Sequence, residues 1–271
     1  MTGIDYEAEY NNRARVPEHP RIMDGWKQDA AVYREQQPSQ VVRYGPGPRN
    51  TIDLFAGGEE GPIVMFIHGG YWQALDGSWF SHCSRGLNAH GISVAIPSYD
   101  LCPEVTVETI IAQMRAATAV LARRGRPLVI SGHSAGGHLA ACMLATDWSA
   151  MDASLSKDLV TAAYAISGLF DLAPLVGTSI NRALRLVDAT ARAASPLFWA
   201  APAGASLDAV VGERESAEYH RQSQGIVGRW GEAGVATSYA VIADANHFTA
   251  IAPLADPRSP MVARLKRLAL R

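Results

Sequence analysis

The sequence predicts an α/β protein with a mostly parallel central sheet flanked by helices. Short apolar segments alternate with segments of helical length, and this alternation is typical of strands joined by crossover helices. Several of the short segments are apolar at every position and do not alternate between apolar and polar residues. Such continuous runs are typical of strands in a sheet that is covered on both faces. Of the 271 residues, 48% are hydrophobic and 18% are charged, which permits a large core and excludes the disordered and disulfide-rich classes.

The N-terminal half begins with a polar arm, residues 1–40, in which we expect one helix over 22–36. Residues 41–44 and 51–55 flank a turn rich in glycine and proline, which predicts an antiparallel hairpin at the edge of the sheet. The next elements are expected in the order strand, helix, strand, helix, at residues 62–67, 78–90, 92–97 and 106–124.

The C-terminal half continues the alternation with one interruption. A strand is expected at 128–131 and a helix at 137–147. Residues 168–206 contain three prolines and only short helical stretches, so we interpret them as a small cap insertion over the carboxyl edge of the sheet. The cap belongs to a single domain that spans residues 1–271. Further strands and helices are expected at 160–167, 207–211, 216–233, 236–242 and 256–270.

The charge and cysteine content restrict the partners and the compartment. The net charge of −2 lacks the basic excess of a nucleic-acid-binding protein. The sequence has neither the apolar core of a signal peptide nor an apolar run long enough to span a membrane, so no membrane partner is expected. Three cysteines without a C-x-x-C pair favour the cytoplasm. We expect a small-molecule substrate. A homodimer that forms through the last strand and the closing helix is a further possibility.

A glycine-flanked serine stands between a predicted strand and a predicted helix. Residues 132–136, GHSAG, match the pattern G-x-S-x-G, in which a sharp strand-to-helix turn lifts the serine hydroxyl above the sheet. The glycines are needed because side chains there would clash in the strained turn. The pattern indicates Ser134 as a nucleophile; the alternative is a glycine-rich turn with a serine helix cap.

A serine hydroxyl needs a base, and the base needs an acid that orients it. In this arrangement the chain order is serine, acid, histidine, and His247 lies a few residues after the last predicted strand. The acid is expected after the preceding strand, where Glu213 and Glu215 compete. Asp208 and Asp244 are weaker candidates.

A third motif, His68-Gly69-Gly70, follows the buried strand at 62–67. Lipases and esterases place such a motif where its backbone N–H groups bind the oxyanion. We therefore expect the N–H group of Gly69 or of Gly70, or both, to form an oxyanion hole with that of Ala135. The three motifs in this order predict a serine hydrolase.

Several longer stretches carry a resemblance to a known family. They are HGGYWQALD at 68–76, YDLCP at 99–103, GHSAGGHLA at 132–140, SGLFDL at 167–172 and EYHRQS at 218–223. In these stretches the chain resembles the arylformamidase (kynurenine formamidase) branch of the α/β-hydrolase fold, near the hormone-sensitive-lipase-like esterases. The resemblance implies hydrolysis of N-formylkynurenine to kynurenine and formate, with no cofactor and no metal. It also implies Ser134 as nucleophile and His247 as base. The family's acid is an aspartate at the position of Glu215, so Glu215 is preferred over Glu213.

The substrate-binding residues are expected to adjoin the catalytic elements. Tyr71, Trp72 and Phe248 are the candidates to line the pocket. Arg182 and Arg185, in the cap, are candidates to bind a substrate carboxylate, but exposure statistics favour solvated surface arginines.

Three functions follow from these residues. The leading one is hydrolysis of an aryl formamide or related small amide through an acyl-enzyme. A carboxylesterase that acts on short acyl or aryl esters is the alternative, because the catalytic parts are shared. A non-catalytic ligand-binding protein on the same fold is the alternative of another class.

Overall fold

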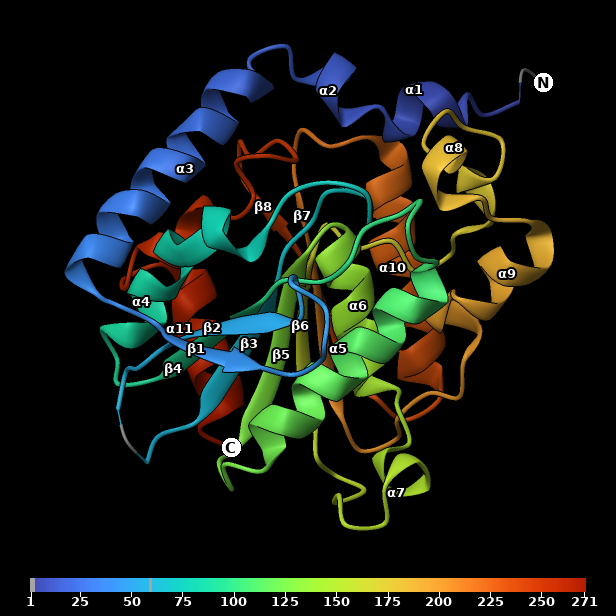
Figure 1. Ribbon diagram of the computed structural model, residues 1–271. Helices are drawn as coiled ribbons and strands as arrows, with labels where there is room; N and C mark the ends of the chain where they lie inside the picture. Colours follow the sequence, from blue (N-terminus) through green and yellow to red (C-terminus); the bar gives the residue numbers. More distant parts are fainter. Residues whose placement is uncertain (1–2, 59) are drawn as a thin grey trace.

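One mixed sheet runs through the structure (Figure 1), a computed structural model that describes residues 3–58 and 60–271. Its strands are β1 (Gln40–Arg43), β2 (Thr51–Phe55), β3 (Ile63–Ile67), β4 (Ser93–Pro97), β5 (Leu128–His133), β6 (Ala162–Ile166), β7 (Ser206–Gly212) and β8 (Ala236–Ile242). Their spatial order is β1-β2-β4-β3-β5-β6-β7-β8. β1 pairs antiparallel with β2, and β2 with β4, while all other pairs are parallel. The predicted hairpin edge and mostly parallel sheet are confirmed.

Helices cover both faces of this sheet. The five longest are α3 (His19–Gln36), α5 (Val107–Ala122), α6 (Ala135–Leu144), α10 (Ala217–Glu232) and α11 (Pro260–Ala269). One hydrophobic core lies beneath α5, α6 and α10, and a second beneath α3 and α11. The short helices are α1 (Tyr6–Tyr10), α2 (Asn12–Arg15), α4 (Arg85–Asn88), α7 (Trp148–Met151), α8 (Asn181–Leu184) and α9 (Asp188–Ala193), with 3-10 turns η1 (Gly77–Ser84), η2 (Ala173–Leu175), η3 (Pro196–Phe198) and η4 (Ala252–Ala255).

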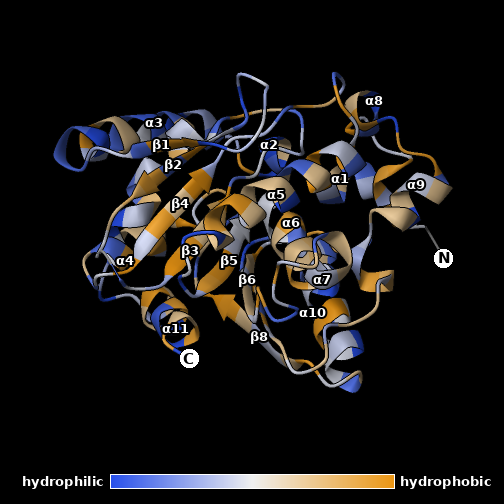
Figure 2. Ribbon diagram, turned by 60° about the horizontal axis from the view of Figure 1, so that its bottom comes forward, coloured by the Kyte–Doolittle hydropathy of each residue, from blue (hydrophilic) through white to orange (hydrophobic). Residues whose placement is uncertain are grey.

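The central strand β3 shows why its sequence is apolar at every position. Ile63 and Met65 point into the core beneath α5 and α6, whereas Val64 and Phe66 point into the core beneath α11. Successive side chains of a strand face opposite sides of the sheet, so a sheet covered on both faces needs apolar residues throughout. Figure 2 shows this hydrophobic centre in β3 and β4.

The helix predicted at 78–90 is only partly α-helical. Residues Gly77–Ser84 form a 3-10 helix, and α4 follows it. Gly77, Phe80 and Cys83 recur at every third residue and all are buried. A spacing of three suits the three residues per turn of a 3-10 helix.

The N-terminal arm is more ordered than its polar sequence indicates. The helix expected at 22–36 lies within α3, but α1 and α2 were not predicted. Tyr10, at the end of α1, is fully buried; its hydroxyl donates to Glu218 Oε2 (2.8 Å) and accepts from Gln222 Nε2 (2.9 Å). These contacts hold the arm against α10, at the carboxyl edge of the sheet. Within the described part of the chain, no helix is long and apolar enough to cross a membrane.

Buried histidines make the stability of the fold depend on pH. Burial lowers the pKa of His68, His82 and His138 to about 4, whereas an unfolded histidine titrates near about 6.5. Between these values the unfolded chain binds more protons than the folded chain, so acidification favours unfolding. The free energy of unfolding should therefore fall as the pH decreases from about 6.5 to about 4, by up to about 3 kcal/mol for each histidine.

His138 is a suitable residue for testing this dependence, because its Nε2 lies 2.7 Å from the carbonyl oxygen of Ala194 and a glutamine amide can replace that contact. In His138→Gln, urea unfolding should show a shallower pH dependence than in the wild type. His90→Gln, at an exposed position, should keep the wild-type dependence. An unchanged dependence in His138→Gln would contradict the assignment.

Candidate active site

Ser134 occupies a sharp turn between β5 and α6. Its φ of 57° and ψ of −117° lie in a region that side-chain-bearing residues rarely adopt. The turn brings α6 so close to the strands that a Cβ on Gly136 would lie 1.9 Å from the carbonyl oxygen of Ile67. Only glycine fits there, which explains the G-x-S-x-G spacing.

Ser134, His247 and Glu215 form one hydrogen-bonded chain. Ser134 Oγ lies 3.0 Å from His247 Nε2, and His247 Nδ1 lies 2.6 Å from Glu215 Oε2. All three residues are buried. Glu215 and His247 follow β7 and β8, which run parallel to β5, so the three strands deliver these side chains to the same edge of the sheet.

The second oxygen of the Glu215 carboxylate is also fixed. Oε1 accepts the backbone N–H of Gly212 (2.7 Å) and the hydroxyl of Ser167 (2.5 Å). The sequence interpretation gave Ser167 no role in the site. Its position directly after the buried strand β6, at the same sheet edge, is the signal that could have indicated it.

The competing acids have other partners. Glu213 is exposed and accepts the backbone N–H of Asp244 at 2.8 Å. Asp244 itself pairs with Arg214, and Asp208 pairs with Arg264. The structure therefore brings Glu215, and none of these three acids, to His247.

His133 supports the loop that carries His247. Its Nε2 lies 2.8 Å from the carbonyl oxygen of His247. Burial, and then the neighbouring His247, hold the pKa of His133 well below its usual range. A neutral His133 donates its Nε2 proton to this carbonyl and so fixes the backbone of the loop. Among the described residues, no three or more His, Cys, Asp or Glu side chains are grouped so that they could hold a metal ion.

The backbone N–H groups expected to form the oxyanion hole belong to segments next to Ser134. A Cβ on Gly69 would lie 3.0 Å from Ser134 Cβ, so this glycine permits the close approach of its loop. Gly70 has a φ of 109° and lines the adjacent cavity. No hydrogen bond between described residues uses the N–H of Gly69, Gly70 or Ala135. These groups, with the N-terminus of α6 behind Ala135, are available to bind a developing negative charge.

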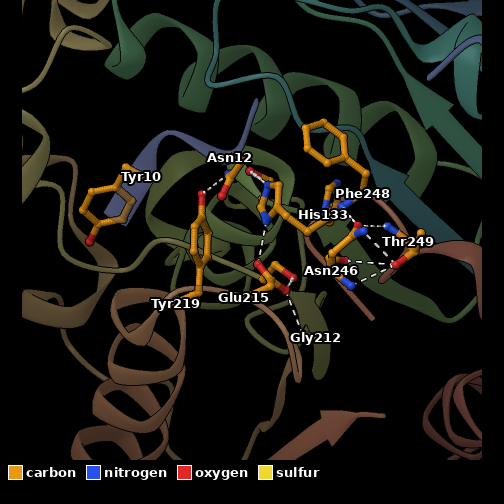
Figure 3. A network of polar contacts seen from close by, with 12 residues as sticks. Tyr10, Asn12, His133, Gly212, Glu215, Tyr219, Asn246, Phe248 and Thr249 are labelled. Atoms are coloured by element: carbon orange, nitrogen blue, oxygen red, sulfur yellow. Dashed lines mark hydrogen bonds and ion pairs between the residues drawn. The ribbon is translucent and has the colours of Figure 1, made fainter. Parts of the chain in front are cut away.

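A cluster of tyrosine hydroxyls joins the arm to this site. Tyr71 donates its hydroxyl proton to the carbonyl oxygen of Tyr10 (2.6 Å), and its Oη lies 2.6 Å from Tyr219 Oη. Asn12 Nδ2 donates to Tyr219 Oη at 2.8 Å (Figure 3). The Tyr219 ring centroid is 4.6 Å from that of His247. Burial raises the pKa of both tyrosines, so they remain neutral hydroxyls.

A cavity of about 430 Å³ opens beside Ser134 and His247. Tyr71 and Phe248 line it, as expected. The expectation for Trp72 is wrong, because its ring is fully buried and contacts the ring of His138 edge-on at 5.0 Å. The residue has a φ of 56°, and this local turn directs its side chain into the core. Proximity along the chain therefore did not predict the direction of the side chain.

The arm supplies a wall of this cavity that was not predicted. Arg182 and Arg185 are exposed and lie outside the lining, in agreement with the favoured interpretation of both as surface arginines. Ser179 and Ile180 are the contribution of the 168–206 insertion. The lining residues from the arm are Glu7, Tyr10, Asn11, Asn12, Arg13, Met23 and Trp26.

Comparison with known proteins identifies the family of this chain. A family model described as alpha/beta hydrolase fold matches residues 64–250, more than half of the chain. The chain belongs to the α/β hydrolase family. The predicted fold class is thereby confirmed.

Three similar proteins indicate a hydrolase within this family. A kynurenine formamidase from Danio rerio is 27% identical over 226 residues, which cover 79% of this chain and 76% of the relative. An isoprenylcysteine alpha-carbonyl methylesterase from Arabidopsis thaliana is 28% identical over 60% of this chain and 42% of its own length. The crystal structure of a candidate thioesterase from Silicibacter sp. TM1040 has a TM-score of 0.87 at 33% identity, covering 96% of this chain and 98% of that chain. The expected resemblance to kynurenine formamidases is confirmed.

Proposed function

We propose that this hydrolase cleaves an aryl formamide such as N-formylkynurenine through an acyl-enzyme on Ser134. The observation that carries the proposal is the continuous chain from Ser134 Oγ through His247 to Glu215, with distances of 3.0 Å and 2.6 Å, beside a cavity. An arrangement of this kind activates a hydroxyl that is otherwise a weak nucleophile at neutral pH.

In the proposed reaction, each step has a defined atom. His247 Nε2 takes the proton of Ser134 as Oγ bonds to the formyl carbon. The N–H groups of Gly69, Gly70 and Ala135 stabilise the resulting oxyanion, and each such donor typically contributes about a hundred- to a thousandfold in rate. As the C–N bond breaks, His247 returns the proton to the aniline nitrogen. His247 Nε2 then takes a proton from water as the water oxygen bonds to the formyl carbon. The bond between that carbon and Ser134 Oγ breaks, formate leaves, and Nε2 returns the proton to Oγ.

Glu215 keeps His247 in the tautomer that these reaction steps require. Its Oε2 accepts the Nδ1 proton, so the unprotonated Nε2 faces Ser134. When His247 becomes an imidazolium, the same carboxylate stabilises the positive charge. Gly212 and Ser167 hold the other oxygen and so fix the carboxylate in this orientation.

The substrate class is supported by the Danio rerio relative and by the cavity. That relative is a kynurenine formamidase and aligns with 79% of this chain. Tyr71 and Phe248 offer aromatic surface to an aryl ring beside Ser134. An aniline also leaves more readily than an alkyl amine.

Ester hydrolysis is the second candidate. The similar methylesterase and candidate thioesterase support it, and both reactions use the same nucleophile, base and oxyanion donors. A non-catalytic binding role is not favoured, because Ser134, His247 and Glu215 are all present at hydrogen-bonding distance.

A comparison of substrates separates the two hydrolytic functions. We expect the protein to turn over N-formylkynurenine with a kcat/KM at least equal to that for p-nitrophenyl acetate. The assays follow absorbance changes from kynurenine and p-nitrophenolate on the same preparation. Rapid ester turnover with negligible formamide turnover would establish the esterase function instead.

Two further features of the chain remain proposals. We place the protein in the cytoplasm, supported by Cys83, Cys102 and Cys142, which are all free and buried. We also propose that a homodimer can form along β8, the last strand of the sheet, on which Val241 is 47% exposed.

A further inference from the structure

The N-terminal arm forms the outer wall of the cavity that contains Ser134. Seven lining residues come from the arm, while the 168–206 insertion contributes only Ser179 and Ile180. Groups of the substrate that extend away from Ser134 therefore meet mainly the arm. The side chains of the arm are where specificity for such groups should be sought.

Two charged side chains stand in this wall. Among the described lining residues, Glu7 and Arg13 are those that carry a charge at neutral pH, histidines aside. Both carboxylate oxygens of Glu7 are already occupied: they accept the backbone N–H and the hydroxyl of Ser179, each at 2.7 Å. Glu7 therefore joins the arm to the insertion, and Arg13 is the charged group that remains for a ligand.

Arg13 is anchored beside the site while its guanidinium is open. The side chain is exposed and forms no hydrogen bond or ion pair with the described residues. The preceding residue, Asn12, is buried, and its amide donates to Tyr219 Oη (2.8 Å) and Tyr71 Oη (3.2 Å). Because Tyr71 itself lines the cavity next to Ser134, these bonds fix the backbone of Arg13 at the cavity wall.

We propose that Arg13 binds a carboxylate at the end of the substrate remote from the scissile formamide. The inference rests on the proposed function, since N-formylkynurenine carries an α-amino acid group at that end. A guanidinium offers parallel N–H donors that match the two oxygens of a carboxylate. Arg13, and neither Arg182 nor Arg185, is thus the specificity-determining cation of the site.

The test compares two substrates that differ by one group. N-formylkynurenine and its decarboxylated analogue share the aryl formamide, the ketone and the ammonium group. We expect Arg13→Gln to lower kcat/KM for the carboxylate-bearing substrate on the order of 10- to 100-fold, mainly through KM. The loss on the analogue should be less than about threefold, and Arg13→Lys should restore part of the activity.

Arg15→Gln is the matched control, because Arg15 lies on the same short helix, is exposed and does not line the cavity. It should match the wild type on both substrates. Equal losses on both substrates in Arg13→Gln would show a structural role and overturn the proposal. No loss on either substrate would overturn it as well.

A binding measurement keeps this inference separate from the proposed function. In the Ser134→Ala background, calorimetry should show that Arg13→Gln weakens the binding of kynurenine on the order of tenfold. The affinity for kynuramine, which is kynurenine without its carboxylate, should stay unchanged. If the wild type hydrolyses no formamide, the proposed function fails, and this titration still decides the role of Arg13. Equal affinities of the two proteins for kynurenine, or no binding to either, would overturn it.

Discussion

Ser134→Ala should lower kcat by about a millionfold, the scale observed when the nucleophile of other serine hydrolases is removed. The reason is that His247 Nε2, 3.0 Å from Ser134 Oγ, would face a methyl group that cannot attack a carbonyl. Turnover of N-formylkynurenine by a concentrated sample measures the residual rate. Mass spectrometry after treatment with a serine-directed probe should show adduct formation in the wild type and none in the variant.

Ser223→Ala provides the matched control for this substitution. Ser223 is buried on α10, and its hydroxyl makes no hydrogen bond with the described residues. Its replacement should leave kcat within about twofold of the wild type. Circular dichroism should show that both variants are folded. Retention of wild-type activity by folded Ser134→Ala would refute the assignment of the nucleophile.

Glu215→Gln should lower kcat by about 10⁴-fold, comparable to loss of the acid in other triads. The substitution preserves the shape of the side chain but removes its charge. The amide can also donate to His247 Nδ1, which places the imidazole proton on Nε2, facing Ser134. The imidazolium that forms during attack would lose its stabilising charge as well.

Glu213→Gln is the control for the acid, since Glu213 lies two residues earlier and is exposed. Its kcat should remain within about twofold of the wild type. Steady-state kinetics on both variants therefore distinguish the two glutamates that the sequence left in competition. A large loss in Glu213→Gln with a small loss in Glu215→Gln would reverse the assignment.

The sequence predicted the features that repeat a local pattern. Strand β3 could be recognised from its continuous apolar segment, because both faces of that strand are buried. Ser134 and His247 were identified because each lies in the segment that follows a parallel strand, and such strands end at one edge of the sheet. A motif at the end of a strand therefore indicates where its side chain lies in the fold, even when the packing is unknown.

The features that were missed depend on contacts distant in the sequence. The polar sequence of α1 and α2 gives no amphipathic pattern, and the burial of Tyr10 and Asn12 comes from partners more than 200 residues away. The choice between Glu213 and Glu215 depends on the loop after β7, which turns one side chain inward and the other outward. The direction in which such a side chain points follows from tertiary packing and cannot be predicted from the spacing of residues in the sequence.

The contact between Asn12 and Tyr219 has a consequence for the order in which the protein matures. These residues are separated by 207 positions, and Tyr10 and Gln222 by 212. During synthesis the arm leaves the ribosome before α10, and its partners on α10 follow more than 200 residues later. Domains fold as units once their partners are available. The substrate cavity is thus completed late, and a nascent chain that already contains Ser134 has no finished pocket.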